Sequence, residues 1–327
     1  MTTDTQLINQ WLEHHERERG RSTRTLYTYS QDAKRLLAHL FGSSLSLGQA
    51  STDDLRGWVH APLVKGSLAG QAPMPATIKR KVSTLRSLYG FLHAEGLVNT
   101  NPAARLFAPK VSNENPKPVD LGTWRTLWGS DLSDADRVGL GLALFLGLRR
   151  SEVVSVTADM FGPTMLTEFR RKGGKLGTVP WLSCVTLFEE RDATLLGGSS
   201  DSFVNPLNRL LASRPGGFPL VPFEDEPLRA CTRAERSASI DPQALNRRLK
   251  RALRRSGEDP AAFTPHQLRH TFCTLLIDWD VPLLVVSRLA GHANQAVTER
   301  YIQTREDPLA GLLAPQAEVE VKGFSRI

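Results

Sequence analysis

The segment 264–270, TPHQLRH, places basic and imidazole side chains where they could act on a phosphate. His266 and Arg269 are three residues apart, so a helix puts both on one face, and His270 lies one turn from His266. Arginine offers a planar fork for two phosphate oxygens, and histidine carries a proton near neutral pH. Two histidines four residues apart also suggest zinc, but Gln267 stands where a zinc protease needs its glutamate base. The phosphate-directed hypothesis is therefore the stronger one.

Two further groups of candidates precede this segment. Arg149 follows an apolar stretch, and Glu152 lies three residues further on, within its reach on a helix. Lys172 and Lys175 flank two glycines in the sequence KGGK, which is typical of a turn. Taken singly, these residues have ordinary structural explanations as an interior ion pair and as turn lysines.

A last group lies near the C-terminus, where His292 ends the sequence LAGH and Tyr301 follows nine residues later. By itself Tyr301 would be a packed aromatic side chain with a solvated hydroxyl. Several other chemistries lack their motifs: KGGKLG does not have P-loop spacing, no GxGxxG follows a strand, and no GxSxG is present. ATP hydrolysis, dinucleotide redox chemistry and serine-hydrolase chemistry are therefore disfavoured.

The first hundred residues are predicted to be a run of helices, over about 5–106. Ser22 or Thr23 caps a helix that runs to about Leu40, and a second helix follows Pro75 and ends near Gly96. One face of the second helix is apolar and the other is basic, with Lys79, Arg80, Lys81 and Arg86. The polar stretch 109–118, with three prolines, is the predicted linker.

Beyond the linker the pattern predicts more helices and one small sheet. A helix is expected over about 138–158, and alternation around a glycine-rich basic turn predicts a β-hairpin over 164–181. Further helices are expected over about 184–190, 203–213, 243–256, 265–278 and 282–290.

The helix predicted over 243–256 carries an apolar stripe and a basic face. The stripe consists of Leu245, Leu249 and Leu253. The face consists of Arg247, Lys250, Arg251 and Arg254, with Arg248 and Arg255 adding charge. Like charges one turn apart repel by a few tenths of a kcal/mol, about 0.2–0.5 per pair, so an anion along this face would explain it. The alternatives are a solvated helix face and contact with a phosphate backbone.

The composition is that of an ordinary globular protein with a basic excess. The 327 residues include 41 Lys+Arg and 34 Asp+Glu, a net charge of +7, and 40% are hydrophobic. This length suggests two domains, and the charge favours a polyanionic partner such as nucleic acid. Three scattered cysteines imply no disulfide framework, and neither a signal peptide nor a membrane-spanning segment is recognisable. We expect a cytoplasmic protein without membrane association.

Taken in order, GLRRSE at 147–152, KGGK at 172–175, HQLRH at 266–270, GH at 291–292 and Tyr301 resemble the tyrosine recombinase (phage integrase) family. Each of the six functional positions of that family has a counterpart: Arg149, Lys172, His266, Arg269, His292 and Tyr301. The resemblance covers nearly the whole chain, and the ordered set is far more specific than any one member.

This resemblance implies a mainly α (α+β) fold. An all-helical SAM-like core-binding domain over 1–108 and the linker at 109–118 would precede a mostly helical catalytic domain over 119–327, with a small antiparallel β-sheet and a tail from about 308. The chain is most similar to the simpler, Xer-like members, which have no arm-binding domain.

The resemblance also implies a chemistry and a role for each residue. Tyr301 would attack a DNA phosphodiester and leave a 3′-phosphotyrosine, which a 5′-hydroxyl later reverses, with no ATP, metal or other cofactor. Arg149 and Arg269 would clamp the phosphate, and His266 would be the base or relay. Lys172 would protonate the leaving oxygen, with Lys175 as the competing candidate, and His292 would support the phosphate. Glu152 would orient Lys172 or a neighbouring basic group, and His270 would help to hold the motif helix.

The implied partner is double-stranded DNA, gripped between the two domains. The candidate DNA-binding residues are Lys79, Arg80, Arg86, Lys175, Arg247, Lys250, Arg251 and Arg254. A tetramer on a Holliday junction is expected, formed by one recombinase or by two that pair, with the tail of 308–327 exchanged between subunits. The alternatives are a type IB topoisomerase-like relaxing enzyme and a DNA-binding protein without catalysis.

Overall fold

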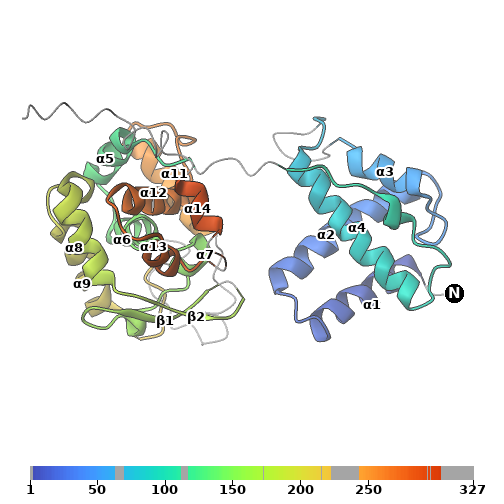
Figure 1. Ribbon diagram of the computed structural model, residues 1–327, viewed down its shortest axis with the longest axis horizontal. Coiled ribbons are helices and arrows are strands. Elements are labelled where there is room, and N and C mark those ends of the chain that lie inside the picture. The colour runs from blue at the N-terminus through green and yellow to red at the C-terminus, as the bar shows by residue number, and fades with distance from the viewer. Residues whose placement is uncertain are drawn as a thin grey trace, which may run out of the picture. The chain divides into compact units, whose positions relative to one another are not determined.

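The computed structural model describes residues 3–62, 70–111, 117–171, 173–214, 216–221, 243–292, 294 and 296–302. The chain divides into two compact units, Met1–Asn113 and Glu114–Ile327 (Figure 1). Each unit has a hydrophobic core of its own. The mainly helical fold with one small antiparallel sheet, predicted from the sequence, is confirmed.

The described part of the N-terminal unit is helical. Its elements are α1 (Asp4–Arg17), α2 (Thr23–Gly42), α3 (Thr52–His60), α4 (Pro75–Ala94) and the 3-10 helix η1 (Pro102–Arg105). The Ser22 hydroxyl accepts a hydrogen bond from the amide of Thr25 and caps α2, while Gly96, with φ of +66°, follows the end of α4. Trp11 and Leu85 are fully buried between these helices. Both helices predicted for this unit are confirmed.

The basic residues of α4 are largely bound within their own unit. Lys81 is buried and donates from Nζ to the carbonyls of Trp58 (2.9 Å) and Val59 (3.2 Å) at the end of α3. Arg80 forms an ion pair with the buried Asp32. Arg86 donates to the Leu106 carbonyl at 2.5 Å. Two of the predicted DNA contacts, Arg80 and Arg86, therefore have intramolecular partners. The third, Lys79, is exposed.

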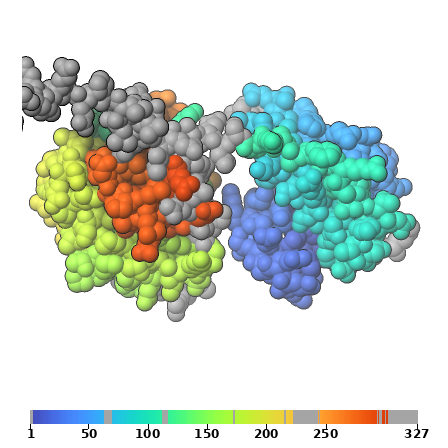
Figure 2. All heavy atoms as spheres, in the orientation of Figure 1, coloured from blue at the N-terminus to red at the C-terminus, as the bar shows by residue number. Residues whose placement is uncertain are grey.

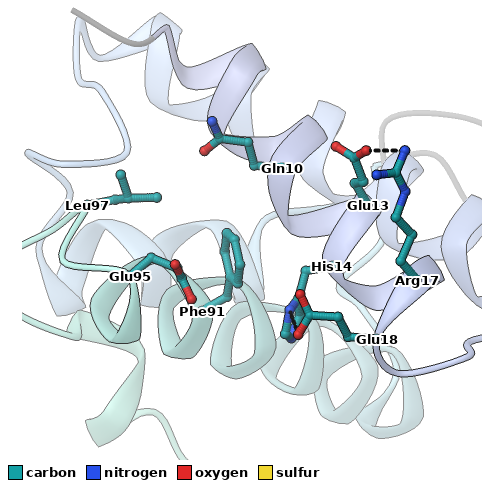
Figure 3. Close-up of a pocket in the computed structure, with 8 residues that line it drawn as sticks. All are labelled: Gln10, Glu13, His14, Arg17, Glu18, Phe91, Glu95 and Leu97. Carbon is teal, nitrogen blue, oxygen red and sulfur yellow. Dashed lines mark ion pairs between the residues drawn. The ribbon is translucent and has the colours of Figure 1, made fainter.

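A groove of about 440 Å³ lies between α1 and the end of α4 in the N-terminal unit (Figure 3). His14 and Arg17 line it together with three carboxylates, Glu13, Glu18 and Glu95. Arg17 is paired with Glu13 at 2.7 Å, and His14 contacts Glu18 at 3.0 Å. Because the charges are mixed and paired, the groove is poorly suited to a polyanion.

The C-terminal unit contains the longer series of elements. They are α5 (Leu121–Gly129), α6 (Asp134–Leu144), α7 (Arg150–Val153), η2 (Ala158–Met160), β1 (Leu166–Arg170), β2 (Leu176–Val179), α8 (Trp181–Asp192), η3 (Ala193–Leu196), α9 (Asp201–Ser213), α11 (Gln243–Arg255), α12 (Pro265–Asp278), α13 (Leu283–Ala290) and α14 (Ala296–Ile302). The buried helix α6 contacts α9, α11 and α12. Strands β1 and β2 pair antiparallel, with Leu166 opposite Val179. The hairpin and the later helices were predicted correctly.

The single helix predicted over 138–158 is wrong. Helix α6 ends at Leu144, and the short helix α7 begins only at Arg150. Gly147 lies between them with φ of +63°, a left-handed conformation that stops a helix. A Cβ at this position would lie 2.4 Å from Cδ1 of Phe272, so the chain passes close to α12 here.

Helix α11 has the predicted leucine stripe, with Leu245, Leu249 and Leu253 fully buried. Arg248 does not extend the basic face as expected. It is buried and forms an ion pair with Asp136 of α6, with Nε and Oδ1 2.6 Å apart. Within the described ranges, no helix has the length and apolar character needed to cross a bilayer.

Candidate active site

The C-terminal end of α13 gathers three guanidinium groups from distant parts of the chain. Three consecutive carbonyls accept one hydrogen bond each: Leu289 from Arg171 (3.0 Å), Ala290 from Arg269 (2.5 Å) and Gly291 from Arg149 (2.8 Å). Carbonyls at a helix C-terminus lack intrahelical partners and carry partial negative charge, so cations are favoured there. The helix end therefore sets the spacing of the three cations.

Gly291 is essential to this arrangement. Its φ is +62°, and its amide bonds back to Ser287 and Arg288, which leaves the next three carbonyls for the arginines. A Cβ on Gly291 would lie 1.4 Å from Nη1 of Arg171. The glycine of the sequence GH thus admits a guanidinium that no other residue would accommodate. In Figure 2, the orange surface of the C-terminal unit belongs to the described residues from 243 to 302, which include α13 and α14.

Arg269 is held by two carbonyls and is only 2% exposed. Its Nη2 binds Ala290, and its Nη1 donates to the Gly147 carbonyl at 2.5 Å. Two of its five N–H groups are used in these bonds to the described backbone, which fix the plane of the guanidinium. Burial lowers the pKa of Arg269 to about 10, which is still well above neutral pH, so the side chain stays charged.

Arg149 is oriented by Glu152, a carboxylate that is 1% exposed. The Glu152 carboxylate accepts from the backbone amide of Arg149 (2.9 Å) and from its Nη1 (2.8 Å). The sequence suggested that Glu152 orients either Lys172 or a neighbouring basic group. In the structure it contacts a neighbouring basic group, Arg149. The Arg149 side chain keeps 24% of its surface exposed.

Tyr301 lies in the same cluster, with its hydroxyl 2.5 Å from Nδ1 of His270. The residue is 2% exposed, and the buried thiol of Cys273 lies beside the same hydroxyl. The ring of His292 stacks on Tyr301 with centroids 6.2 Å apart, and its Nδ1 is 2.7 Å from the Thr298 hydroxyl. Helix α14 therefore brings Tyr301 and His292 together.

His270, not His266, contacts the tyrosine hydroxyl, which differs from the sequence expectation. His270 lies one turn further along α12 than His266. Helix α14 packs against α12 and places the Tyr301 hydroxyl next to His270. Among the described residues no hydrogen bond joins His266 to Tyr301, although the two imidazole rings of α12 are 4.4 Å apart. Desolvation, followed by the charges of nearby arginines, lowers the pKa of His266 from 6.5, so its imidazole is neutral at pH 7 and able to accept a proton.

Lys172 lies outside the described residues, as does the tail from 303 onward. The hairpin around Lys172 is defined: the Arg171 amide donates to the Lys175 carbonyl (2.8 Å), and the Gly174 amide donates to the Arg171 carbonyl (3.1 Å). Lys175 is exposed. No group of three His, Cys, Asp or Glu side chains that could hold a metal occurs in the described part of the chain.

This geometry supports phosphoryl chemistry at a tyrosine. Fixed guanidinium groups stabilise charge on phosphate oxygens without reorganising, and a nearby neutral imidazole can take a phenolic proton. Two family profiles match the chain: the phage integrase family over residues 219–307, and the phage integrase N-terminal SAM-like domain over residues 8–96. Curated tyrosine recombinases align over more than nine-tenths of the chain.

The chain belongs to the phage integrase family of tyrosine recombinases. It is 29% identical to tyrosine recombinase XerD of Rhizobium meliloti over 319 residues, which cover 94% of this chain and 93% of the relative. It is also 29% identical to tyrosine recombinase XerC of Alcanivorax borkumensis over 307 residues, covering 90% and 88%. The chain is thus a tyrosine site-specific recombinase.

Solved structures of recombinases share the fold. A lambda integrase (75–356) dimer bound to a COC′ core site gives a TM-score of 0.62 at 19% identity, covering 96% of this chain and 99% of that one. A lambda integrase tetramer bound to a Holliday junction also gives 0.62 at 19% identity, covering 90% and 79%. The predicted SAM-like domain and integrase-like fold are confirmed.

Sequence reasoning missed two parts of this recombinase site. Arg171 stands beside Lys172 in a basic turn, and nothing in its local sequence distinguishes it from a solvated charge. The carbonyls of residues 289–291 are backbone groups, so no residue type signals their role. The glycine of GH at 291 was the only available sign, because glycine commonly marks a left-handed helix end.

Proposed function

We propose that this recombinase cleaves one strand of duplex DNA with Tyr301 as nucleophile. The phenolic oxygen attacks the scissile phosphorus, a new phosphorus–oxygen bond forms, and the bond to the 5′-oxygen breaks. The product is a 3′-phosphotyrosine and a free 5′-hydroxyl. One phosphodiester replaces another, so the step needs neither ATP nor an oxidant and can be reversed by a 5′-hydroxyl of a partner strand.

The proton transfers are assigned to residues of α12 and of the β1–β2 turn. His270 holds the phenolic hydroxyl of Tyr301. His266, whose ring lies 4.4 Å from the ring of His270, relays the proton towards solvent. Lys172 gives a proton to the departing 5′-oxygen, and Lys175 remains the alternative donor. His292 supports a phosphate oxygen.

Arg149 and Arg269 stabilise the negative charge that builds up on the equatorial oxygens of the transition state. One observation carries this assignment: both guanidinium groups bind adjacent carbonyls of the same helix end. Their spacing is therefore set before a phosphate arrives. Because Tyr301 is 2% exposed, a phosphate reaches its hydroxyl only after α14 has shifted.

DNA and other recombinase subunits are the proposed partners. Lambda integrase, which shares the fold, is bound to a core site as a dimer and to a Holliday junction as a tetramer. By this analogy we propose a tetramer on a junction, with the tail of 308–327 docking on a neighbouring subunit. The exposed residues Lys79, Arg247 and Arg254 are the strongest candidates for backbone contact.

The proposal is tested by trapping the covalent intermediate. The protein is incubated with fragmented genomic DNA of its host and denatured in detergent, and DNA that remains attached is sequenced. That duplex, the recovered site, is then prepared with a nick that lets the cleaved fragment diffuse away. The wild type should accumulate a detergent-resistant adduct and Tyr301→Phe none.

Tyr27→Phe is the matched control, because Tyr27 is 57% exposed on α2 and loses the same hydroxyl. It should form the adduct as fast as the wild type. A folded wild-type protein that yields no adduct on host DNA, or an adduct that survives Tyr301→Phe, contradicts the proposal. Relaxation of plasmids without the recovered site would favour the topoisomerase-like alternative.

A further inference from the structure

Arg171 is a half-buried guanidinium with no assigned part in the reaction. Besides its bond to the Leu289 carbonyl, it lies over the Phe169 ring with 5.1 Å between Cζ and the ring centroid. The side chain also packs against two glycines. A Cβ built on Gly291 would lie 1.4 Å from Nη1 of Arg171, and a Cβ built on Gly177 would lie 2.5 Å from its Nε. The side chain is thus enclosed by both strands of the hairpin and by the end of α13.

The charge of Arg171 belongs to the same electrostatic cluster as Arg149 and Glu152. Burial lowers the pKa of Arg171, the Glu152 carboxylate opposes that shift, and the Arg149 guanidinium adds to it. A solvated turn residue would not be desolvated in this way. Keeping a second guanidinium beside Arg149 has an electrostatic cost, which the carbonyl and the carboxylate offset.

The backbone of Arg171 closes the hairpin turn as well. Its amide donates to the Lys175 carbonyl, and its own carbonyl accepts from the Gly174 amide. One residue therefore defines the turn through its main chain and attaches it to α13 through its side chain. The bond to Leu289 spans 118 positions of the chain.

We propose that Arg171 is a positioning residue that fastens the tip of the β1–β2 hairpin to the C-terminal end of α13. The hairpin and the two phosphate-clamping arginines then share one rigid frame. The inference rests on the proposed function, because the residue after Arg171 is Lys172, the proposed proton donor. Arg171 acts on the reaction through the placement of that donor and not by touching the phosphate.

The test separates loss of the proton donor from loss of the clamp. The recovered site is prepared in two nicked forms, one natural and one with sulfur in place of the scissile 5′-oxygen. A thiol has a pKa near 8.5, far below that of an alcohol, so a thiolate leaves without protonation. Single-turnover adduct formation is measured on both forms.

Arg171→Met keeps the apolar stem over Phe169 and removes the guanidinium. We expect it to slow cleavage of the natural substrate about 10- to 100-fold, as for other groups that orient a reacting one, and to match the wild type within about threefold on the sulfur substrate. Arg171→Lys, which keeps the charge and one donor, should fall between the two. Arg170→Met is the matched control, because Arg170 is the preceding residue and is exposed; it should leave both rates unchanged.

An equal loss on both substrates would overturn the proposal, since it would place Arg171 in the clamp. Unchanged cleavage by folded Arg171→Met would overturn it too, and so would an equal defect in Arg170→Met. The wild type itself reports on the proposed function: no adduct on either substrate would refute that function independently of Arg171. Thermal denaturation identifies variants that are not folded. If Arg171→Met is not folded, the rates of Arg171→Lys on the two substrates decide the outcome.

Discussion

Arginines serve two opposite purposes within the C-terminal unit. At the end of α13, Arg149, Arg171 and Arg269 are partly or fully buried, and each is bound to a backbone carbonyl. On α11, Arg247 and Arg254 lie exposed above a buried leucine stripe. The first set supplies fixed geometry, and the second supplies charge at the surface.

Burial is what separates the two sets. Arg149 and Arg269 are already held by carbonyls and lose little side-chain freedom when a phosphate arrives, so their interaction energy is available to the transition state, whereas Arg171 acts through the hairpin. An exposed cation is screened by salt and attracts DNA mainly through release of bound counterions. Substitutions in the first set should therefore change the rate of cleavage, and substitutions in the second should change affinity and its salt dependence.

The largest effect is expected for Arg269→Ala. Removing a fixed donor to the transition state should slow single-turnover adduct formation about 10³-fold at saturating DNA. Arg269→Lys keeps the charge but cannot reach both carbonyls, so we expect a loss of about 10²-fold. Affinity for the recovered site, measured by electrophoretic mobility shift, should change little. Normal cleavage at saturation with weakened binding would remove the distinction between the two sets.

Gly147→Ala tests the backbone that holds Arg269. The new Cβ would meet Phe272 at 2.4 Å, at a φ of +63° that alanine tolerates poorly. Strain and overpacking together should lower the free energy of unfolding by about 2–4 kcal/mol, measured by urea denaturation. Gly129→Ala is the control, because Gly129 is exposed at the end of α5 with open space around it. It should be neutral or slightly stabilising, and equal losses in both variants would contradict this account.

Arg254→Gln tests the surface set on α11. Losing one phosphate contact should reduce the slope of log affinity against log salt by about 1 and leave cleavage at saturation unchanged. Arg191→Gln, an exposed arginine at the end of α8, should leave the slope as it is. If both variants alter the slope equally, α11 is no more a DNA-facing surface than α8.

The smallest effect is expected in the pH dependence of the cleavage rate. Because the pKa of His266 is lowered from 6.5, its neutral, proton-accepting form persists below that pH. The rate of cleavage should therefore fall only as the pH drops through a value below 6.5, and it should be constant from there to pH 8. In His266→Asn this acidic limb should disappear from single-turnover profiles. A limb centred above pH 7, or one that the variant retains, would exclude His266 as the relay.

The elements that carry the site were predictable because their signals are local. Capping by Ser22 and the leucine stripe of α11 located helices correctly, and the ordered motifs pointed to the residues that we propose to react. The break after α6 was missed because an uninterrupted apolar run continues through Gly147. The sequence shows neither the left-handed φ of that glycine nor the packing of Phe272 into the space that a Cβ would occupy.

The contacts among the site residues could not be predicted for a different reason. Which imidazole meets Tyr301 depends on how α14 packs on α12, and motif order carries no information about that packing. The acceptors for the arginines are main-chain carbonyls, which every residue possesses. Sequence therefore identified Arg149 and Arg269, but neither Arg171 nor the helix end that orients all three.

The most direct test of the account is the chemical identity of the covalent link. The adduct formed on the recovered site is made in EDTA without nucleotide, digested with trypsin and nuclease, and analysed by mass spectrometry. We predict one modified peptide, in which Tyr301 carries the 3′-phosphate of the cleaved strand. A link through another residue, a 5′-phosphate, or an adduct that forms only with a divalent metal would contradict a tyrosine nucleophile acting within a cluster of protein cations.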